Sequence, residues 1–156
     1  MYIPTIKGAR ISHKAIWNVI NSERKYFQLN SNDVCALTYP LHTIQSANQI
    51  YSAILTGCTI TVFRRQDLAE MENFIKCPPV NKLTKLILMY HDFDNFLTSI
   101  ESLGKKETKK TLKSLKLVIC EGALLPRHAV NNAKRLFKTK EQMSALHMRN
   151  FTGLAD

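Results

Sequence analysis

The chain has 156 residues, of which 45% are hydrophobic, so it is long enough for one domain with a hydrophobic core and too apolar for a disordered chain. The formal net charge of +10 favours anionic, phosphate-bearing partners but does not specify a fold. No apolar run approaches the roughly 20 residues of a membrane span, and the amino terminus lacks the pattern of a signal peptide. We therefore expect a cytoplasmic protein without a membrane partner.

The first half of the chain alternates between amphipathic helices and short apolar strands. The residue patterns predict helices over 12–27 and 43–57 and strands over 33–40 and 58–63. Ser12 is a suitable N-cap for the first helix, and Gly57 is suited to a left-handed end of the second. The helical spacing of Ile16, Val19 and Ile20 predicts that they face the core.

The second half repeats the alternation. Helices are predicted over 67–76, 91–103 and 126–137, and strands over 83–90, 115–120 and 144–151. A lysine-rich segment, 105–116, precedes the fourth strand, and we expect it to form a solvated loop and helix face. The four cysteines are predicted to be buried, reduced thiols, because none has the close spacing of a zinc or redox motif: Cys35, Cys58, Cys77 and Cys120.

Strands separated by helical crossovers predict an α/β fold with a doubly wound, mostly parallel sheet and helices on both faces. Ligands of such sheets bind beyond the carboxyl ends of the strands. In this chain those ends are residues 40–42, 90–92, 121–123 and 152–156.

Four segments resemble motifs of adenylate-forming enzymes, in the order in which those enzymes carry them. KGARISHKAIWN, residues 7–18, is similar to the end of the phosphate-loop motif T-S-G-[ST]-T-G-x-P-K-G-V and the helix start after it. TIQSANQIYSAILTGCTITV, residues 43–62, stands where adenylation domains of nonribosomal peptide synthetases carry F-D-x-S-x-x-E. LKLVICEGALLP, residues 115–126, resembles G-G-E-x-L-P, and RNFTGLAD, residues 149–156, resembles N-x-Y-G-x-T-E.

Within this superfamily, residues 83–126 and the RNFTG phrase look most like β-alanyl-amine synthetases of the Ebony type. The resemblance implies ATP and Mg²⁺ as cofactors and attack of a carboxylate on the α-phosphate. It places the nucleotide against these residues: Lys7, Gly8, Gly122, Ala123, Asn150, Phe151, Thr152, Gly153 and Asp156. It also assigns the metal to Asp156 and the substrate pocket to His42, Ile44, Gln45 and Glu121.

The chain departs from the family pattern where the chemistry is most demanding. The hydroxyl-rich part of the phosphate loop is missing before Lys7, and Thr152 replaces the aromatic residue expected against adenine. Glu121 replaces a glycine that would let backbone and substrate approach closely. Gln49 stands at the position of the carboxylate that pairs with a substrate amino group. We assign no catalytic residue.

The expectation is therefore one incomplete AMP-binding domain over residues 1–156, without the small carboxy-terminal catalytic domain. It would be a fragment or degenerate form of an AMP-forming carboxylic-acid or amino-acid ligase, not catalytic alone. Its partners would be an adenine nucleotide, the missing parts of a larger synthetase, or another protein.

Two alternatives come from other classes of protein. A sheet that lacks neighbouring strands exposes an edge, which would suit a noncatalytic interaction module. The lysines of segment 105–116 could instead bind nucleic acid, but they lack the interleaved aromatic residues of single-strand binders, so this alternative is disfavoured.

Overall fold

A computed structural model of the chain describes residues 8–122, 126–137 and 146–150. Its sheet is formed by β1 (Val34–Leu37), β2 (Thr59–Val62), β3 (Lys85–Met89), β4 (Leu117–Gly122) and β5 (Leu146–Asn150). Its helices are α1 (His13–Phe27), α2 (Ile44–Thr56), α3 (Arg65–Ala69), α4 (Met71–Lys76), α5 (Tyr90–Ser102), α6 (Lys105–Leu112) and α7 (Arg127–Leu136), with a 3₁₀ turn, η1 (Pro78–Lys82).

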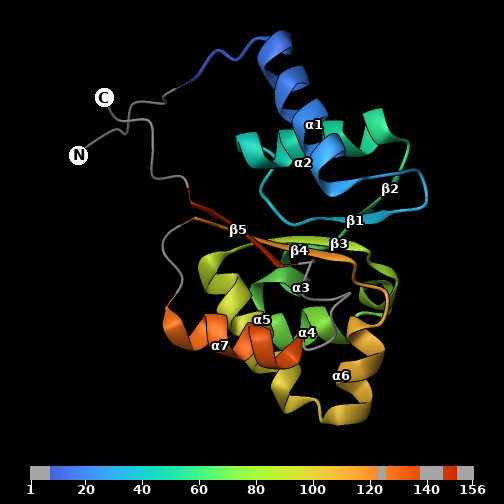
Figure 1. Cartoon of the computed structure of the whole chain (residues 1–156), viewed down its shortest axis with the longest axis vertical. Coiled ribbons are helices and arrows are strands. Elements are labelled where there is room, and N and C mark those ends of the chain that lie inside the picture. Colours follow the sequence, from blue (N-terminus) through green and yellow to red (C-terminus); the bar gives the residue numbers. More distant parts are fainter. Residues whose placement is uncertain (1–7, 123–125, 138–145, 151–156) are drawn as a thin grey trace.

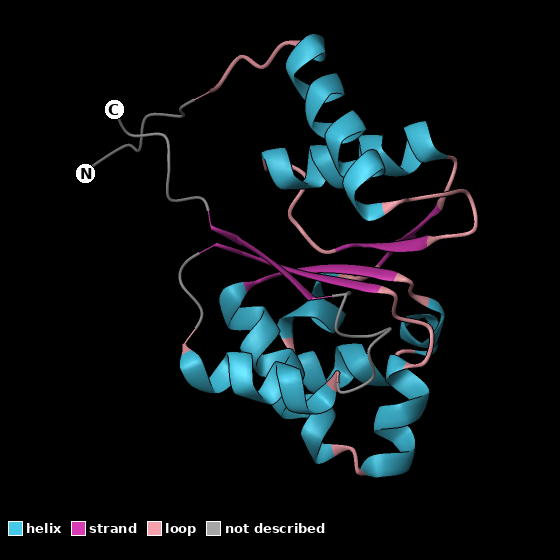
Figure 2. Cartoon of the chain, viewed as in Figure 1, coloured by secondary structure: helices cyan, strands magenta, loops and turns pink. Residues whose placement is uncertain are grey.

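The five strands pair in the order β2-β1-β3-β4-β5, and every pair is parallel. Helices α1 and α2 lie on one face of the sheet, and α3 to α7 lie on the other (Figure 1). The three layers are also distinct in Figure 2, where the strands run between the two groups of helices. The predicted α/β fold with a parallel, doubly wound sheet is confirmed.

The helix ends follow local rules that the sequence carries. The Ser12 hydroxyl accepts a hydrogen bond from Ala15 N at 3.2 Å, which satisfies one of the free N–H groups of the first turn of α1. Gly57 ends α2 with φ of 74°, in the left-handed region that glycine adopts without steric cost. Both predicted caps are present.

The prediction of one continuous helix over 67–76 is wrong. Glu70 has φ of −120° and ψ of 105°, so extended backbone separates α3 from α4. The change of direction allows α4 to bury Phe74 and Ile75, and the Phe63 ring packs edge-on against Phe74 with centroids 4.8 Å apart. Tertiary packing outweighs local helix propensity here.

The core is much larger on one face of the sheet than on the other. Leu86, Leu88, Val118 and Cys120 project toward α4, α5 and α7 and join a cluster centred on Phe74, Phe93, Phe96 and Ile100. The cluster on the α1 and α2 side contains only four buried residues among those described: Tyr39, Ile87, Leu117 and Ile119. The two helices on that face therefore bury far less apolar surface.

The predicted core face of α1 is correct only at Ile20, which is fully buried. Val19 is 41% exposed, and Ile16 is half-buried. The helical period indicates that these side chains share a face, but burial also needs a neighbour on that side.

The expectation for the cysteines is only partly correct. Cys35 and Cys120 are buried, whereas Cys58 and Cys77 are half-buried. Cys35 Sγ and Cys58 Sγ lie 3.6 Å apart because β1 and β2 are neighbours, which their spacing in the sequence does not indicate.

Among the described segments, every helix is too short or too polar to cross a bilayer.

Candidate functional site

The candidate site lies at the carboxyl ends of β1, β3, β4 and β5, which meet at one edge of the sheet because the strands are parallel (Figure 1). Met89 pairs with Glu121 at the end of β3, and Gly122 pairs with Asn150 at the end of β5. Residues from four distant parts of the sequence thus meet there. We call this region the carboxyl edge.

The end of β4 is tied to the segment after β1 by two buried side chains. The Tyr39 hydroxyl donates a hydrogen bond to Glu121 Oε2 over 3.1 Å. Burial, together with the nearby Glu121 carboxylate, raises the pKa of Tyr39 well above its ordinary value, so the hydroxyl keeps its proton and remains a donor. Glu121 is therefore held as an acceptor on the α2 side of the sheet.

Gly122 follows with φ of 116°, a conformation that L-residues with side chains rarely adopt. A Cβ atom at this position would lie 3.5 Å from Cδ1 of Tyr90, the first residue of α5. Glycine is needed here for its backbone angle, while the space beside it allows ordinary contact with the half-exposed Tyr90 ring.

A second buried network joins α2 to the carboxyl edge. Gln49 Oε1 accepts a hydrogen bond from Thr38 N at 3.1 Å, and Gln49 Nε2 donates to Thr38 Oγ1 at 2.9 Å. Thr38 Oγ1 in turn donates to the carbonyl oxygen of Ile87 in β3 at 2.6 Å. The Gln49 amide thus holds α2 and the sheet together.

The structure brings some of the predicted site residues together and leaves others apart. Glu121, Gly122 and Asn150 are neighbours across β4 and β5. Exposed His42 lies in the turn after β1, and exposed Ile44 and half-buried Gln45 lie in the first turn of α2. Gly8 lies in the exposed segment before α1. The remaining predicted residues are outside the described residues: Lys7, Ala123, Phe151, Thr152, Gly153 and Asp156.

The sequence reasoning missed Tyr39 as a member of this edge. The only signal was a tyrosine beside Pro40 at the end of a predicted strand, and its partner Glu121 is 82 positions away. No three His, Cys, Asp or Glu side chains in the described residues are grouped closely enough to hold a metal ion. The described part of the carboxyl edge therefore does not form a Mg²⁺ site by itself.

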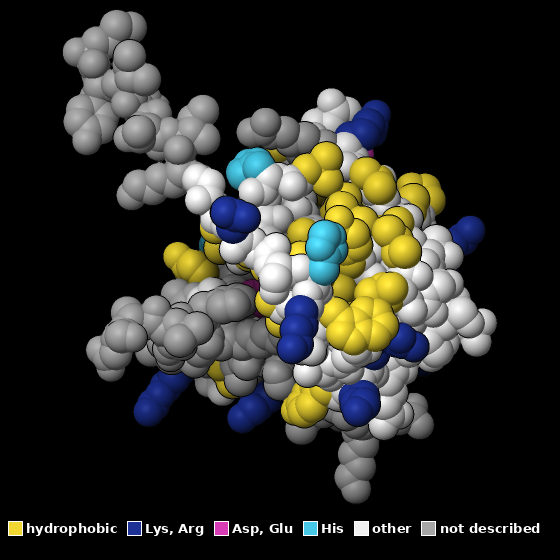
Figure 3. Space-filling model, turned by 90° about the horizontal axis from the view of Figure 1, so that it is seen from above, with side chains coloured by type: hydrophobic (Ala, Val, Ile, Leu, Met, Phe, Trp, Pro, Cys, Tyr) yellow, Lys and Arg dark blue, Asp and Glu magenta, His cyan; other side chains and the backbone are white. Residues whose placement is uncertain are grey.

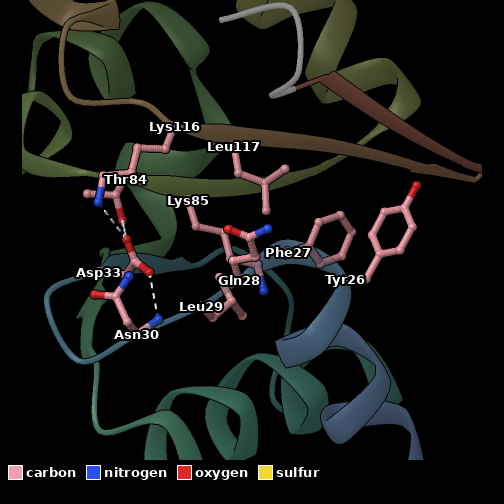
Figure 4. Close-up of a pocket in the computed structure, with 10 residues that line it drawn as sticks. All are labelled: Tyr26, Phe27, Gln28, Leu29, Asn30, Asp33, Thr84, Lys85, Lys116 and Leu117. Atoms are coloured by element: carbon pink, nitrogen blue, oxygen red, sulfur yellow. Dashed lines mark hydrogen bonds and ion pairs between the residues drawn. The ribbon is translucent and has the colours of Figure 1, made fainter. Parts of the chain in front are cut away.

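A hollow of about 440 Å³ lies at the opposite edge, where β1, β3 and β4 begin (Figure 4). The residue before each of these strands contributes to it: Asp33, Thr84 and Lys116. Asp33 Oδ1 accepts hydrogen bonds from Thr84 Oγ1 at 3.0 Å and from Lys116 Nζ at 3.2 Å. These contacts join the starts of three strands, so we interpret this polar cluster as structural.

Burial on its own would raise the pKa of the Asp33 carboxyl. The hydrogen bond from Asn30 N–H, followed by those from Thr84 and Lys116, more than offsets burial and leaves this pKa below its ordinary value. Lys85 is buried beside this cluster, with its Nζ 3.9 Å from Glu23 Oε2 and 5.9 Å from the centre of the Phe27 ring.

Several solved structures share the fold of this chain. A malonyl-CoA ligase, in a ternary product complex with methylmalonyl-CoA and AMP, has a TM-score of 0.72 at 17% identity, over 92% of this chain and 29% of that one. The nonribosomal peptide synthetase FmoA3 has a TM-score of 0.68 at 19% identity, over 81% of this chain and 13% of that one. A form of FmoA3 with AMPPNP bound gives the same values.

The chain thus spans less than a third of the length of each of these proteins. No curated protein matches it by sequence. The model of the AMP-binding enzyme family matches residues 5–146, which include every described helix and strand up to the start of β5. This chain belongs to the AMP-binding enzyme family.

Proposed function

We propose that this chain is a portion of an AMP-forming carboxylic-acid or amino-acid ligase which binds an adenine nucleotide weakly at the carboxyl edge and does not catalyse adenylation alone. The family match and the fold shared with adenylating enzymes support a role in such an enzyme. Within the family, we propose that the chain is most similar to the β-alanyl-amine synthetases of the Ebony type. We also propose that it acts in the cytoplasm.

The observation that carries the proposal is the buried pair of Tyr39 and Glu121. Glu121 stands at the position of a glycine in the motif G-G-E-x-L-P, which this segment resembles. In the proposal, its buried carboxylate therefore lies where the acyl-adenylate would have to approach the backbone closely. A negative charge in a partly desolvated site opposes a phosphate group placed nearby. This arrangement supports loss of turnover with retention of the surrounding scaffold.

The described residues fit the two cofactors of the family unequally. For the adenine base, the half-exposed Tyr90 ring lies beside Gly122 at the end of β4, and we propose it as the aromatic surface nearest to the nucleotide. The Mg²⁺ ion lacks a group of carboxylate ligands in the described part of the chain. ATP would supply the adenylyl group if it bound.

In this proposal the nucleotide lies against Lys7, Gly8, Gly122, Ala123 and the segment 150–153, and Asp156 is the residue closest to a metal. His42, Ile44, Gln45 and Glu121 lie on the side of the acid substrate. No residue is assigned a catalytic role.

Calorimetric titration of the purified chain with Mg-ATP, and with an acyl-sulfamoyl-adenosine mimic of the acyl-adenylate, tests nucleotide binding. We expect weak binding of at least one ligand, reduced by Asp156→Ala, with no exchange of labelled pyrophosphate into ATP. Pyrophosphate exchange by the chain alone would show that it is catalytic. A folded sample that gives no heat with either ligand would remove the nucleotide from the proposal.

We do not propose nucleic-acid binding. Lys110 on α6 lies 3.6 Å from Glu107, and the helix has no aromatic residue on which a base could stack. The lysines of α6 form a solvated helix face.

A further inference from the structure

Helix α2 is oriented with polar side chains toward the protein interior and apolar side chains toward solvent. Ser46, Gln49 and Ser52 are buried. On the other side of the helix, Tyr51 is 46% exposed and Ile54 is 65% exposed. A surface helix normally shows the reverse arrangement, because burial of apolar surface stabilises the fold.

Hydrogen bonds fix this orientation. Gln49 is bound to both the backbone N–H and the hydroxyl of Thr38, as described above. Rotating α2 to bury Ile54 would break these contacts and leave a buried amide without partners, at a cost of about 1–3 kcal/mol for each unsatisfied group. The apolar side of α2 therefore remains outside unless another molecule covers it.

Helix α1 extends the same exposed surface. Trp17 is 49% exposed, and together with Ile16 and Ile20 it faces Tyr51, Ile54 and Leu55 across a groove of about 520 Å³. Figure 3 views this side of the molecule and shows hydrophobic side chains gathered into one continuous area with Lys and Arg side chains around it. We call this surface the α1/α2 groove.

In the layer formed by α1, α2 and their connecting segments, the exposed charged side chains are all basic. Residues 8–57 contain four basic side chains, Arg10, Lys14, Arg24 and Lys25, and two acidic side chains, Glu23 and Asp33. Both acidic side chains are buried. Lys14 and His13 lie in the lining of the α1/α2 groove itself.

This distribution of charge selects among the occupants of the groove. A second copy placed face to face would bring basic side chains against basic side chains, which is unfavourable. An amphipathic helix with carboxylates beside its apolar face would match both the apolar lining and the basic surroundings. A groove between two helices also fits the side chains of a third helix more closely than it fits a flat bilayer surface.

We propose that the α1/α2 groove is a docking site for an amphipathic helix of a partner polypeptide, with acidic residues on both sides of its apolar face. The partner's apolar side chains contact Trp17, Tyr51 and Ile54, and its carboxylates face Lys14 in the groove lining. The proposal does not depend on nucleotide binding, so the two can fail separately.

The probe is a fluorescent helical peptide of about 18 residues, with leucine along one face and glutamate elsewhere, titrated with the purified chain. We expect saturable binding that Ile54→Asp weakens about tenfold or more, because a charge replaces an apolar contact. The matched control is Val62→Asp, which changes a side chain that is 70% exposed on β2 and outside the groove lining. That control should bind as the wild type does.

A second pair of variants tests the charge and does not touch the apolar contacts. Lys14→Glu should weaken binding of the acidic peptide several-fold at low salt and less at high salt, while Lys109→Glu on α6 should leave it unchanged. Circular dichroism confirms that each variant is folded. If Ile54→Asp fails to fold, the Lys14→Glu pair decides the result.

Four outcomes would overturn the proposal. They are no peptide binding by folded wild type, equal binding of a peptide with lysine in place of glutamate, a wild-type dimer in sedimentation that Ile54→Asp dissociates, and binding to phosphatidylserine vesicles without binding to the peptide. The last two would assign the surface to a second copy or to a lipid surface. Calorimetry with Mg-ATP on the same samples reports separately on the carboxyl edge.

Discussion

The Tyr39 hydroxyl donates a hydrogen bond to Glu121 Oε2 across 3.1 Å, and this contact joins the segment after β1 to the end of β4. Strand β3 lies between these two strands in the sheet. A buried acidic side chain is thus held by a neutral donor at the carboxyl edge. The contact joins two segments that are 82 positions apart in the sequence.

Tyr39→Phe should destabilise the chain by about 1–3 kcal/mol, because Glu121 loses a hydrogen bond in a buried position. Urea denaturation followed by circular dichroism measures the change in the free energy of unfolding. Tyr51→Phe, at an exposed tyrosine, is the control and should change it little. Equal stability of Tyr39→Phe and wild type would show that the hydrogen bond is not formed in solution.

The starts of the strands provide a pH-dependent prediction. The pKa of Asp33 is below its ordinary value in the folded protein, so this carboxylate stabilises the fold above about pH 4, and its contribution is lost as the pH falls through its folded pKa. Asp33→Asn should therefore cost about 1–3 kcal/mol at neutral pH and progressively less in acid. Urea titrations at several pH values test this, with the more exposed Asp92→Asn as the control. A pH-independent difference would contradict the role of the charged carboxylate.

Because two thiols are buried, we expect the free energy of unfolding to fall in alkaline solution. Burial, reinforced at Cys35 by neighbouring Cys58, raises the pKa of Cys35 to about 12, and burial with the nearby Glu121 raises the pKa of Cys120 to about 12, both from 9.0. Between these values the folded chain binds more protons than the unfolded chain, so the free energy of unfolding falls as the pH rises from 9 to 12. Each thiol contributes at most about 1.4 kcal/mol per pH unit.

Alkylation provides a direct measurement of these thiols. Iodoacetamide at pH 8 should modify Cys35 and Cys120 of the folded chain more slowly than the half-buried Cys58 and Cys77, as resolved by peptide mass spectrometry. In denaturant the four rates should become similar. Rapid modification of Cys35 in the folded chain would contradict its burial between β2 and β3.

Gly122→Ala should destabilise the fold by about 1–2 kcal/mol, because φ of 116° is a strained conformation for alanine. Gly8→Ala is the matched control, since a Cβ atom at Gly8 would meet nothing within 4 Å and its φ is not in the left-handed region. Thermal unfolding of both variants gives the comparison. Equal melting temperatures would indicate that the backbone at the end of β4 relaxes to an ordinary conformation.

Local features of the chain were predictable because each depends on residues that are close in sequence. Ser12 and Gly57 define helix ends through their own side chain or backbone, and the apolar strands were placed by their composition. The alternation of helix and strand was enough to predict a parallel sheet, since a crossover helix returns the chain in the same direction. The same alternation indicated the edge at which Glu121, Gly122 and Asn150 lie together.

Contacts between distant segments could not be read from the chain alone. The pattern of α2 identifies its polar and apolar sides, yet Gln49 faces inward only because Thr38 offers it partners. Tyr39 meets Glu121, and Cys35 meets Cys58, only after the sheet has assembled. Sequence periodicity therefore determined the elements and their direction, whereas long-range packing and hydrogen bonding determined which side of each element is buried.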